Sequence, residues 1–212
     1  MIKRLAQFKP LSLTIMVFMS VACFSSNLHA SENTLKTDPF FTDPSLIEPS
    51  LKEELANAIA DADSFDDEFS AQVWLVDMSA RLERYVKDPK ERLTLLRMVH
   101  QEATRAEVSP ELVLSIIHIE SLFNPYAVSY VGAQGLMQVM PFWKKEIGRV
   151  DDNLINSATN LRYGCTILKH YLKREKGNWV KALARYNGSV GRMKYPNKVL
   201  GVWQRYWFVD HL

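Results

Sequence analysis

The fold is decided by residues 109–125, which read SPELVLSIIHIESLFNP. Ser109 can cap the free amides of a helix, and Pro110 suits the first helical position because it needs no amide partner there. Glu111 complements the positive end of the helix dipole. The second proline of the segment disfavours helical geometry in the residue before it. We therefore predict a helix from Pro110 to about Phe123.

A single carboxylate, Glu120, lies on an apolar face of this predicted helix. Spacings of three and four residues place it on the same face as Val113, Ile116 and Ile117. Contact with hydrocarbon removes water from the carboxyl group, and the unpaired carbonyls of the last turn also disfavour a negative charge. Both effects raise the pKa of Glu120, which suits a general acid. The alternative is a structural glutamate bound to a basic partner.

The next motif is a glycine-bearing loop at residues 132–138, which read GAQGLMQ. Gly132 and Gly135 permit a positive φ and a close approach of the backbone to a ligand. Gln138 supplies an amide that can hold a neutral polar ligand. Met137, taken by itself, indicates packing in the core. The loop strengthens the interpretation of Glu120 as a catalytic acid.

A third motif, RYNGS at residues 185–189, stands at a predicted helix end. We expect Tyr186 to orient Glu120 by a hydrogen bond, and the alternative is that its phenol satisfies a backbone carbonyl. The following Asn187 begins an Asn-Gly turn.

The rest of the chain predicts a mainly α fold, because no alternating strand pattern of useful length occurs. All eight glycines lie at or after Gly132, so tight turns concentrate in the second half. Cys165 lies in an apolar helical context, which favours a buried inert thiol over a nucleophile. Three stripes at helical spacing predict three amphipathic helices: Leu51, Leu55, Ala58, Ile59 and Ala62; Trp74, Leu75, Met78, Leu82 and Tyr85; Leu93, Leu96, Val99 and Ala103.

The first thirty residues have the layout of a secretory signal: a basic start, an uncharged run from Pro10 to Ser26, and a cleavage site near Ala30. The apolar run is short for a membrane anchor. Lipid attachment at Cys23 fits part of a bacterial lipoprotein signal. Ser20 stands where such signals carry an aliphatic residue, so simple cleavage is favoured over a lipid anchor.

Charge is distributed unevenly along the chain. Residues 31–70 hold eleven acidic and two basic residues, whereas residues 71–212 hold 21 basic and 13 acidic residues. The basic part would be attracted to an anionic polymer. No basic run with interleaved aromatics occurs, which together with export argues against nucleic acid and favours the bacterial envelope. Residues 31–49, with three prolines and scattered acids, predict a flexible acidic leader.

The three motifs together resemble the lytic transglycosylases of bacterial cell-wall metabolism, in particular the goose-type-lysozyme-like domain of the soluble transglycosylases. The resemblance lies in the Glu120-Ser121 pair, in the GLMQ run that ends at Gln138, and in the Tyr186-Asn187 pair. It covers about residues 95–207. It implies a lysozyme-like domain at residues 95–212. The resemblance does not cover residues 50–94, which their apolar spacing predicts to be a helical extension.

The resemblance also implies the substrate and the reaction. The family cleaves the β-1,4 bond between N-acetylmuramic acid and N-acetylglucosamine in peptidoglycan and forms a 1,6-anhydromuramyl product. Glu120 would serve as acid and then as base, with no second carboxylate and no cofactor. Ser121 and Gln138 would bind the sugar, and Met137 would line the cleft. In the third motif, Tyr186 would hold Glu120, and Asn187 would support the turn or contact substrate.

The chain departs from the family pattern around its third motif. Arg185 stands where alanine is common, and GSVG at residues 188–191 replaces an Ala-Gly-rich sequel. Arg185 and Arg192 are either partners for peptide carboxylates of peptidoglycan or solvated charges. The Tyr195-Pro196 pair restores the family's ending.

Two other functions are weighed against this one. A hydrolytic lysozyme would add a water positioned by a second carboxylate, for which Asp151 and Asp152 are the nearest in sequence, although a cap or loop role is favoured for them. The second alternative is a module without catalytic activity that binds peptidoglycan as part of an envelope or secretion complex. No metal site is expected, because His118 and Glu120 diverge on a helix and no His-Glu-x-x-His run exists. We expect a periplasmic protein that acts on glycan strands.

Overall fold

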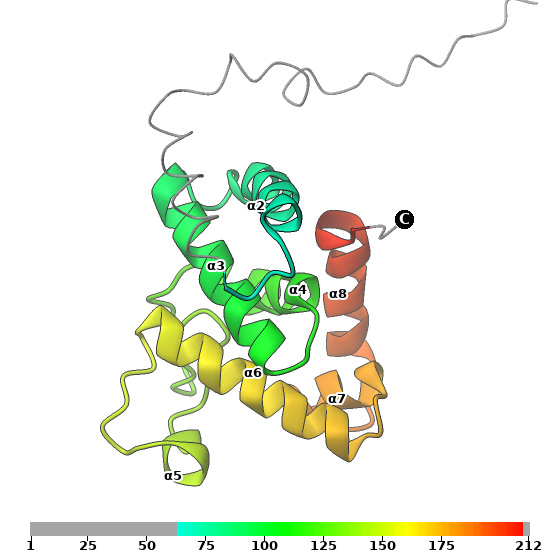
Figure 1. Cartoon of the computed structure of the whole chain (residues 1–212). Helices are drawn as coiled ribbons and strands as arrows, with labels where there is room; N and C mark the ends of the chain where they lie inside the picture. The colour runs from blue at the N-terminus through cyan, green and yellow to red at the C-terminus, as the bar shows by residue number, and fades with distance from the viewer. Residues whose placement is uncertain (1–62, 210–212) are drawn as a thin grey trace, which may run out of the picture. The chain divides into compact units, whose positions relative to one another are not determined.

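The structure, a computed structural model, describes residues 63–209 (Figure 1). The predicted signal at residues 1–30, the leader at residues 31–49 and the predicted helix at residues 51–62 lie outside the described residues. The elements of the described part, in chain order, are α2 (Glu68–Leu82), α3 (Pro89–Arg105), α4 (Pro110–Glu120), α5 (Trp143–Ile147), α6 (Ser157–Arg174), α7 (Trp179–Tyr186), α8 (Lys194–Val202) and the π-helical turn η3 (Trp203–Trp207).

The predicted mainly α fold is confirmed for residues 63–209. Extended pairing in this part is limited to isolated bridges that join Gln134 to Val128 and to Val139. No helix in the same part is long and apolar enough to cross a membrane. The predicted boundary between residues 94 and 95 falls inside α3, and the division into an extension and a lysozyme-like domain stays a prediction.

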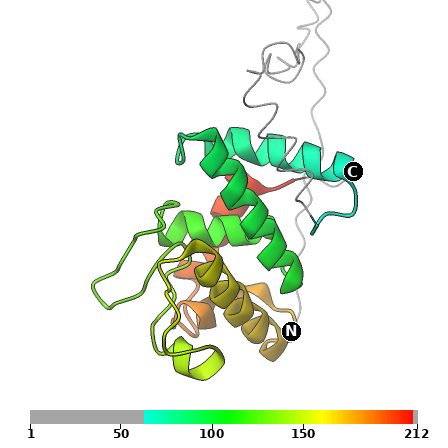
Figure 2. The ribbon, with the colours of Figure 1, turned by 60° about the vertical axis from the view of Figure 1, so that its left-hand side comes forward.

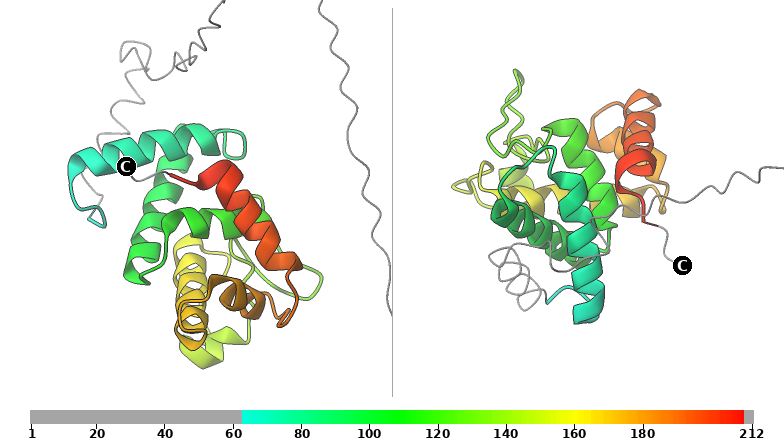
Figure 3. Two further views of the ribbon diagram at one scale, coloured as in Figure 1. Left: turned by 90° about the vertical axis from the view of Figure 1, so that its right-hand side faces the viewer. Right: turned by 90° about the horizontal axis from the view of Figure 1, so that it is seen from above.

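Helix α4 is the centre of the packing, because it contacts α3, α8 and η3. Four of its apolar side chains are fully buried: Val113, Leu114, Ile116 and Ile117. A helix that is apolar on nearly every side belongs in a core. Figures 1 to 3 show α2 at one end of the bundle and α6 with α7 at the other. The end of α4 is therefore held by surrounding helices.

Local sequence explains where α4 begins and ends. The Ser109 hydroxyl accepts a hydrogen bond from the Leu112 amide at 3.2 Å, as the sequence predicts. The helix ends at Glu120, three residues earlier than predicted, because Leu122 and Phe123 adopt positive φ values of 51° and 65°. This left-handed turn buries Phe123 and leaves Leu122 exposed. The structure thus stops α4 directly at its carboxylate.

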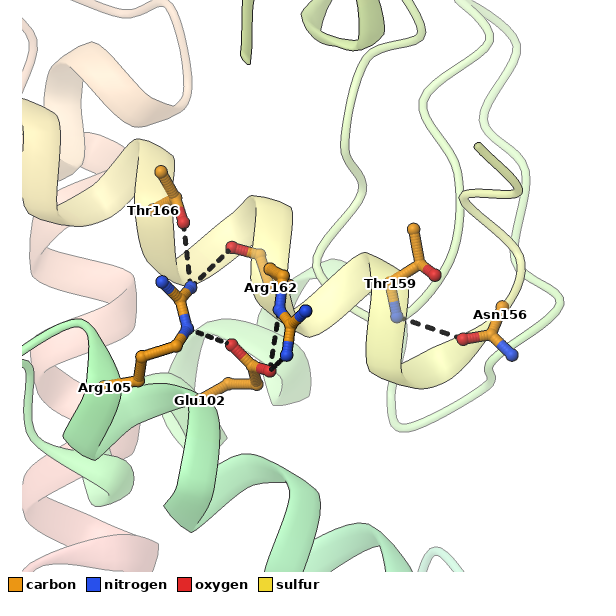
Figure 4. A network of polar contacts seen from close by, with 6 residues as sticks. All are labelled: Glu102, Arg105, Asn156, Thr159, Arg162 and Thr166. Atoms are coloured by element: carbon orange, nitrogen blue, oxygen red, sulfur yellow. Dashed lines mark hydrogen bonds and ion pairs between the residues drawn. The ribbon is translucent and has the colours of Figure 1, made fainter. Parts of the chain in front are cut away.

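An ion network around the buried carboxylate of Glu102 joins α3 to α6 (Figure 4). Glu102 is 3% exposed; its Oε2 accepts from Arg105 Nε at 2.6 Å and its Oε1 from Arg162 Nη2 at 2.7 Å. Arg105 also donates to the Thr166 hydroxyl at 2.9 Å. Burial alone would raise the pKa of Glu102, but the hydrogen bonds from the two arginines outweigh it and lower the pKa.

We predict that Glu102→Gln destabilises the fold by about 1–2 kcal/mol at pH 7, because the amide leaves two guanidinium groups poorly paired. Since the folded-state pKa of Glu102 is lowered, its contribution is complete above the usual pKa of glutamate and is lost as the pH falls through the folded-state value. Urea unfolding of parent and variant at pH 7 and at pH 3 measures both effects.

The control for this variant is Glu107→Gln, which removes an exposed carboxylate that pairs with Lys169 of α6 at 2.5 Å. An exposed pair contributes little, so its unfolding midpoint should stay near that of the parent. Equal midpoints for the two variants would show that the network around Glu102 does not stabilise the α3–α6 contact.

Candidate active site

The site is built around the carboxyl group of Glu120, the last residue of α4. Tyr195, near the start of α8, donates a hydrogen bond from its hydroxyl to Glu120 Oε1 at 2.6 Å. The Glu120 side chain is half-buried and Tyr195 is 9% exposed. The contact between α4 and α8 therefore brings a phenol from residue 195 onto a carboxylate 75 residues earlier.

Burial raises the pKa of Glu120 above its usual value. The hydrogen bond from Tyr195 and the positive charge of Lys198 act in the opposite direction but do not cancel this effect. Burial, with the nearby Glu120 charge, also raises the pKa of Tyr195 well above its usual value, so its hydroxyl keeps the proton that it donates. Within residues 63–209 no ion pair involves Glu120. The carboxyl group is therefore suited to hold and release a proton.

Asn160, on α6, fixes the loop at residues 132–138, which Ser121 ties to the end of α4. Its Oδ1 accepts from the Met137 amide at 2.8 Å, and its Nδ2 donates to the carbonyls of Gln134 and Leu154, each at 2.8 Å. Asn160 is fully buried. A Cβ on Gly135 would lie 2.4 Å from Asn160 Nδ2, and the φ of Gly135 is +72°. The loop therefore needs glycine at position 135 and asparagine at position 160.

Two predicted substrate-binding residues hold the loop in place. The Ser121 hydroxyl lies 2.8 Å from the Leu136 carbonyl and 3.2 Å from that of Ile117, so it ties the end of α4 to the loop. The Gln138 amide nitrogen donates to the Ala127 carbonyl at 3.1 Å and to the Gly135 carbonyl at 3.0 Å. Because both N–H groups of Gln138 are used, its side-chain oxygen is the atom left to accept from a ligand.

The structure corrects two expectations about single residues. Tyr186 donates its hydroxyl hydrogen bond to the Met137 carbonyl at 2.9 Å, so the predicted bond from Tyr186 to Glu120 is wrong. The Met137 side chain is fully buried and packs against Gly164 of α6, so it does not line an open cleft. Hydrogen bonding of a buried phenol to a backbone carbonyl is the ordinary arrangement that competed with the prediction.

The remaining residues of the third motif lie at the end of α7. Asn187 is exposed and caps the helix, with its backbone N–H bonded to the Leu183 carbonyl. Arg185 pairs with Glu175 within the chain, so it is neither simply solvated nor free for a peptide carboxylate. The contact of Asn187 with substrate stays a prediction.

His118, two residues before Glu120, belongs to the core. Trp207 donates from its indole N–H to His118 Nδ1 at 3.2 Å, which leaves the proton of the neutral ring on Nε2, facing the Tyr85 hydroxyl at 2.9 Å. Burial, followed by the charge of Arg84, lowers the pKa of His118. In the part of the chain that the structure describes, no group of three or more His, Cys, Asp or Glu side chains is placed to hold a metal ion.

Sequence reasoning did not assign Tyr195 or Asn160 to the site. Tyr195 appeared only in the Tyr195-Pro196 pair that restores the family's ending. The available signal for Tyr195 was its place directly before a proline in the first turn of a helix. The available signal for Asn160 was an amide side chain on the apolar face of an amphipathic helix.

We predict that Asn160→Ala destabilises the protein by about 3 kcal/mol, because it leaves the buried Met137 amide and the Leu154 carbonyl without partners. Hydrogen exchange should speed up at the Met137 amide. Asn178→Ala is the matched control, since Asn178 makes a single capping bond to the Lys181 amide and its loss costs about 1 kcal/mol. Unchanged exchange at Met137 would mean that Asn160 does not hold the loop.

Comparison with known proteins places these motifs in a family. Residues 97–199 match the family model described as "Transglycosylase SLT domain". The chain is 54% identical over 46 residues to "Membrane-bound lytic murein transglycosylase C" of Actinobacillus pleuropneumoniae serotype 5b, which covers 22% of this chain and 13% of that protein. It is 34% identical over 100 residues to "Transglycosylase" of Enterobacteria phage PRD1, covering 44% of this chain and 37% of that protein.

One solved structure, an inactive mutant of lytic transglycosylase Slt from Pseudomonas aeruginosa, aligns with a TM-score of 0.43 at 24% identity. The alignment covers 79% of this chain and 35% of that chain. The chain thus spans well under half the length of each of these relatives. Residues 97–199, which carry Glu120 and all three sequence motifs, belong to the transglycosylase SLT domain family.

Proposed function

We propose that this protein is an exported peptidoglycan lytic transglycosylase. It cleaves the β-1,4 bond between N-acetylmuramic acid and N-acetylglucosamine and releases 1,6-anhydromuramyl products. The observation that carries the proposal is the half-buried Glu120 carboxyl, whose pKa is raised and whose only hydrogen-bond donor within residues 63–209 is Tyr195. The relatives, named as lytic murein transglycosylases, support the substrate class.

Glu120 acts twice in the proposed mechanism. It first gives its proton to the glycosidic oxygen, which leaves as the 4-hydroxyl of N-acetylglucosamine while the substrate's own N-acetyl group assists at the anomeric carbon. The ionised Glu120 then takes the proton of the C6 hydroxyl as that oxygen bonds to the anomeric carbon and closes the anhydro ring. The proton count balances, and Glu120 ends protonated for the next cycle.

Tyr195 serves as a positioning residue in this mechanism. Its hydrogen bond fixes one carboxylate oxygen and stabilises the ionised form that exists between the two steps. Burial favours the protonated form that starts the reaction. The balance of the two effects gives one group a pKa that serves both as acid and as base.

The hydrolytic alternative needs a second carboxylate near the bond. Asp152 accepts from the Tyr163 hydroxyl at 2.5 Å and from the Arg149 amide at 3.0 Å, and these bonds lower its pKa. Asp151 is an exposed loop residue. These contacts support a turn-forming role for Asp152, and the lowered pKa makes its carboxylate a weaker base for activating water. A silent binding module would not require the raised pKa of Glu120.

The proposal includes export to the bacterial envelope, with the periplasm as the working compartment. The layout of residues 1–30 and the words "membrane-bound" in the names of relatives support it. A complex with a secretion or envelope machine and a lipid anchor at Cys23 stay open, and the anchor is the less favoured form.

We predict that Glu120→Gln lowers the release of anhydromuropeptides from purified peptidoglycan by at least about a thousandfold, because the amide cannot exchange the proton. Mass spectrometry of the products is the readout. Asp152→Asn is the control and should retain most of the activity. If the parent releases reducing ends in place of anhydro ends, and Asp152→Asn no longer releases them, the reaction is hydrolysis with Asp152 as the second carboxylate. If Glu120→Gln leaves the activity unchanged, the proposed mechanism with Glu120 as acid and base is excluded.

We further predict that Tyr195→Phe raises the pKa of Glu120, since it removes a bond that favours the ionised form. The first step needs protonated Glu120, so the alkaline limb of the kcat/KM profile should move to higher pH, with kcat reduced about tenfold. Tyr186→Phe removes the bond to the Met137 carbonyl and should leave that limb in place. An equal shift in both variants would argue against a specific role of Tyr195.

A further inference from the structure

The segment between α4 and α5 presents large apolar side chains to solvent. Its exposed fractions are 76% for Tyr126, 62% for Val128, 101% for Tyr130 and 56% for Val131. Figures 2 and 3 show this green segment extending away from the helices that precede and follow it. Exposed apolar groups gathered on one short segment mark a contact surface more often than scattered single residues do.

Hydrogen bonds give the segment a defined shape. The Ser129 amide donates to the Ala133 carbonyl and the Gly132 amide to the Ser129 carbonyl, each at 2.9 Å. The Ala133 amide donates to the Ser129 hydroxyl at 3.0 Å. Gly132, with a φ of +87°, closes the turn. Residues 126–133, called the arm from here on, are therefore ordered, and they carry the rings of Tyr126 and Tyr130.

The base of the arm is joined to the loop at residues 132–138, which is tied to Ser121, the residue after Glu120. The Gly135 amide donates to the Ala127 carbonyl at 2.8 Å, and Gln138 donates to the same carbonyl at 3.1 Å. Gln138 follows the loop residues that Ser121 and Asn160 hold in place. The arm and the catalytic loop thus form one continuous hydrogen-bonded unit.

We propose that Tyr126 and Tyr130 form a distal contact for the glycan strand, beyond the sugars that flank the cleaved bond. The inference rests on the proposed function. A glycan strand continues past the cleaved bond, so an ordered arm that begins at the catalytic loop lies where further sugar rings can pass. A tyrosine offers a flat apolar face to the C–H side of a sugar ring and a hydroxyl to its polar groups.

The size of the exposed patch favours a glycan over a protein partner. A stable protein interface engages roughly 20–30 residues on each side, whereas the arm offers four large apolar side chains. A chain of sugars needs only successive rings to rest against. Aromatic faces on a rigid support suit such a ligand, because little side-chain freedom is lost on binding.

The position of the arm determines which kinetic constant we expect it to affect. Tyr130 lies in the turn of the arm, two residues beyond Val128, which bridges to Gln134 at its base. A contact that binds the ground state and the transition state equally lowers KM and leaves kcat unchanged, and we assign the contact of the arm to this kind. Fragments too short to reach the arm should not respond to its tyrosines.

The experiment compares the full chain with Tyr126→Ala, Tyr130→Ala and the double variant. The matched control is Phe69→Ala, which removes an aromatic side chain on α2 that is 75% exposed. Binding is measured by cosedimentation with insoluble peptidoglycan, with every protein also carrying Glu120→Gln so that the polymer stays intact. Kinetics are measured with Glu120 present, on long glycan strands and on a fragment of two disaccharides.

We expect the double variant to bind the polymer about tenfold more weakly and to show a KM about tenfold higher on long strands. The double variant should match the parent in its kcat on long strands, in its kinetics on the short fragment and in its circular dichroism. Phe69→Ala should match the parent in binding and in all kinetic constants. Unchanged binding in the double variant overturns the inference and leaves the arm for a protein partner. Equal losses on long and short substrates also overturn it.

These readouts separate the two proposals. Failure of the parent to release anhydro products would refute the proposed reaction, and the cosedimentation series would still decide whether the arm binds glycan. Loss of binding in the double variant supports the distal contact in either case.

Discussion

The active site depends on one hydrogen bond, which Tyr195 donates to the Glu120 carboxylate at 2.6 Å. It crosses the contact between α4 and α8, so the core that joins these helices also sets the geometry of the acid. Burial favours the protonated carboxyl, and the phenol favours the ionised one. A group between these two influences can give a proton and take one back, which a mechanism without a second carboxylate requires.

The surroundings of this pair are fixed by side chains that would otherwise be free to touch substrate. Ser121 ties the end of α4 to the loop, Gln138 bonds to the carbonyls of Ala127 and Gly135, and the buried Asn160 fastens the loop to α6. Much of the apparent binding chemistry is therefore used to shape the backbone. Substrate recognition is left to the Gln138 side-chain oxygen and to surfaces farther along the strand.

The sequence predicted the mainly α fold, the start of α4 and the position of Glu120, because caps, prolines and apolar spacing act over a few residues. The roles of Tyr186, Met137 and Tyr195 could not be predicted in the same way. Which of two tyrosines reaches a carboxylate depends on how α7 and α8 pack against α4, and a sequence pattern does not contain that packing. The early end of α4 likewise depends on the pocket that buries Phe123.

The most direct measurement of the central claim is the pKa of the Glu120 carboxyl in the free protein. It can be followed by carbon NMR of protein labelled at glutamate side chains, with Glu120→Gln used to assign the signal. The account predicts a pKa clearly above the usual 4.5 of glutamate. A pKa at or below 4.5 would show that Glu120 is ionised from the outset and would contradict its role as the proton donor.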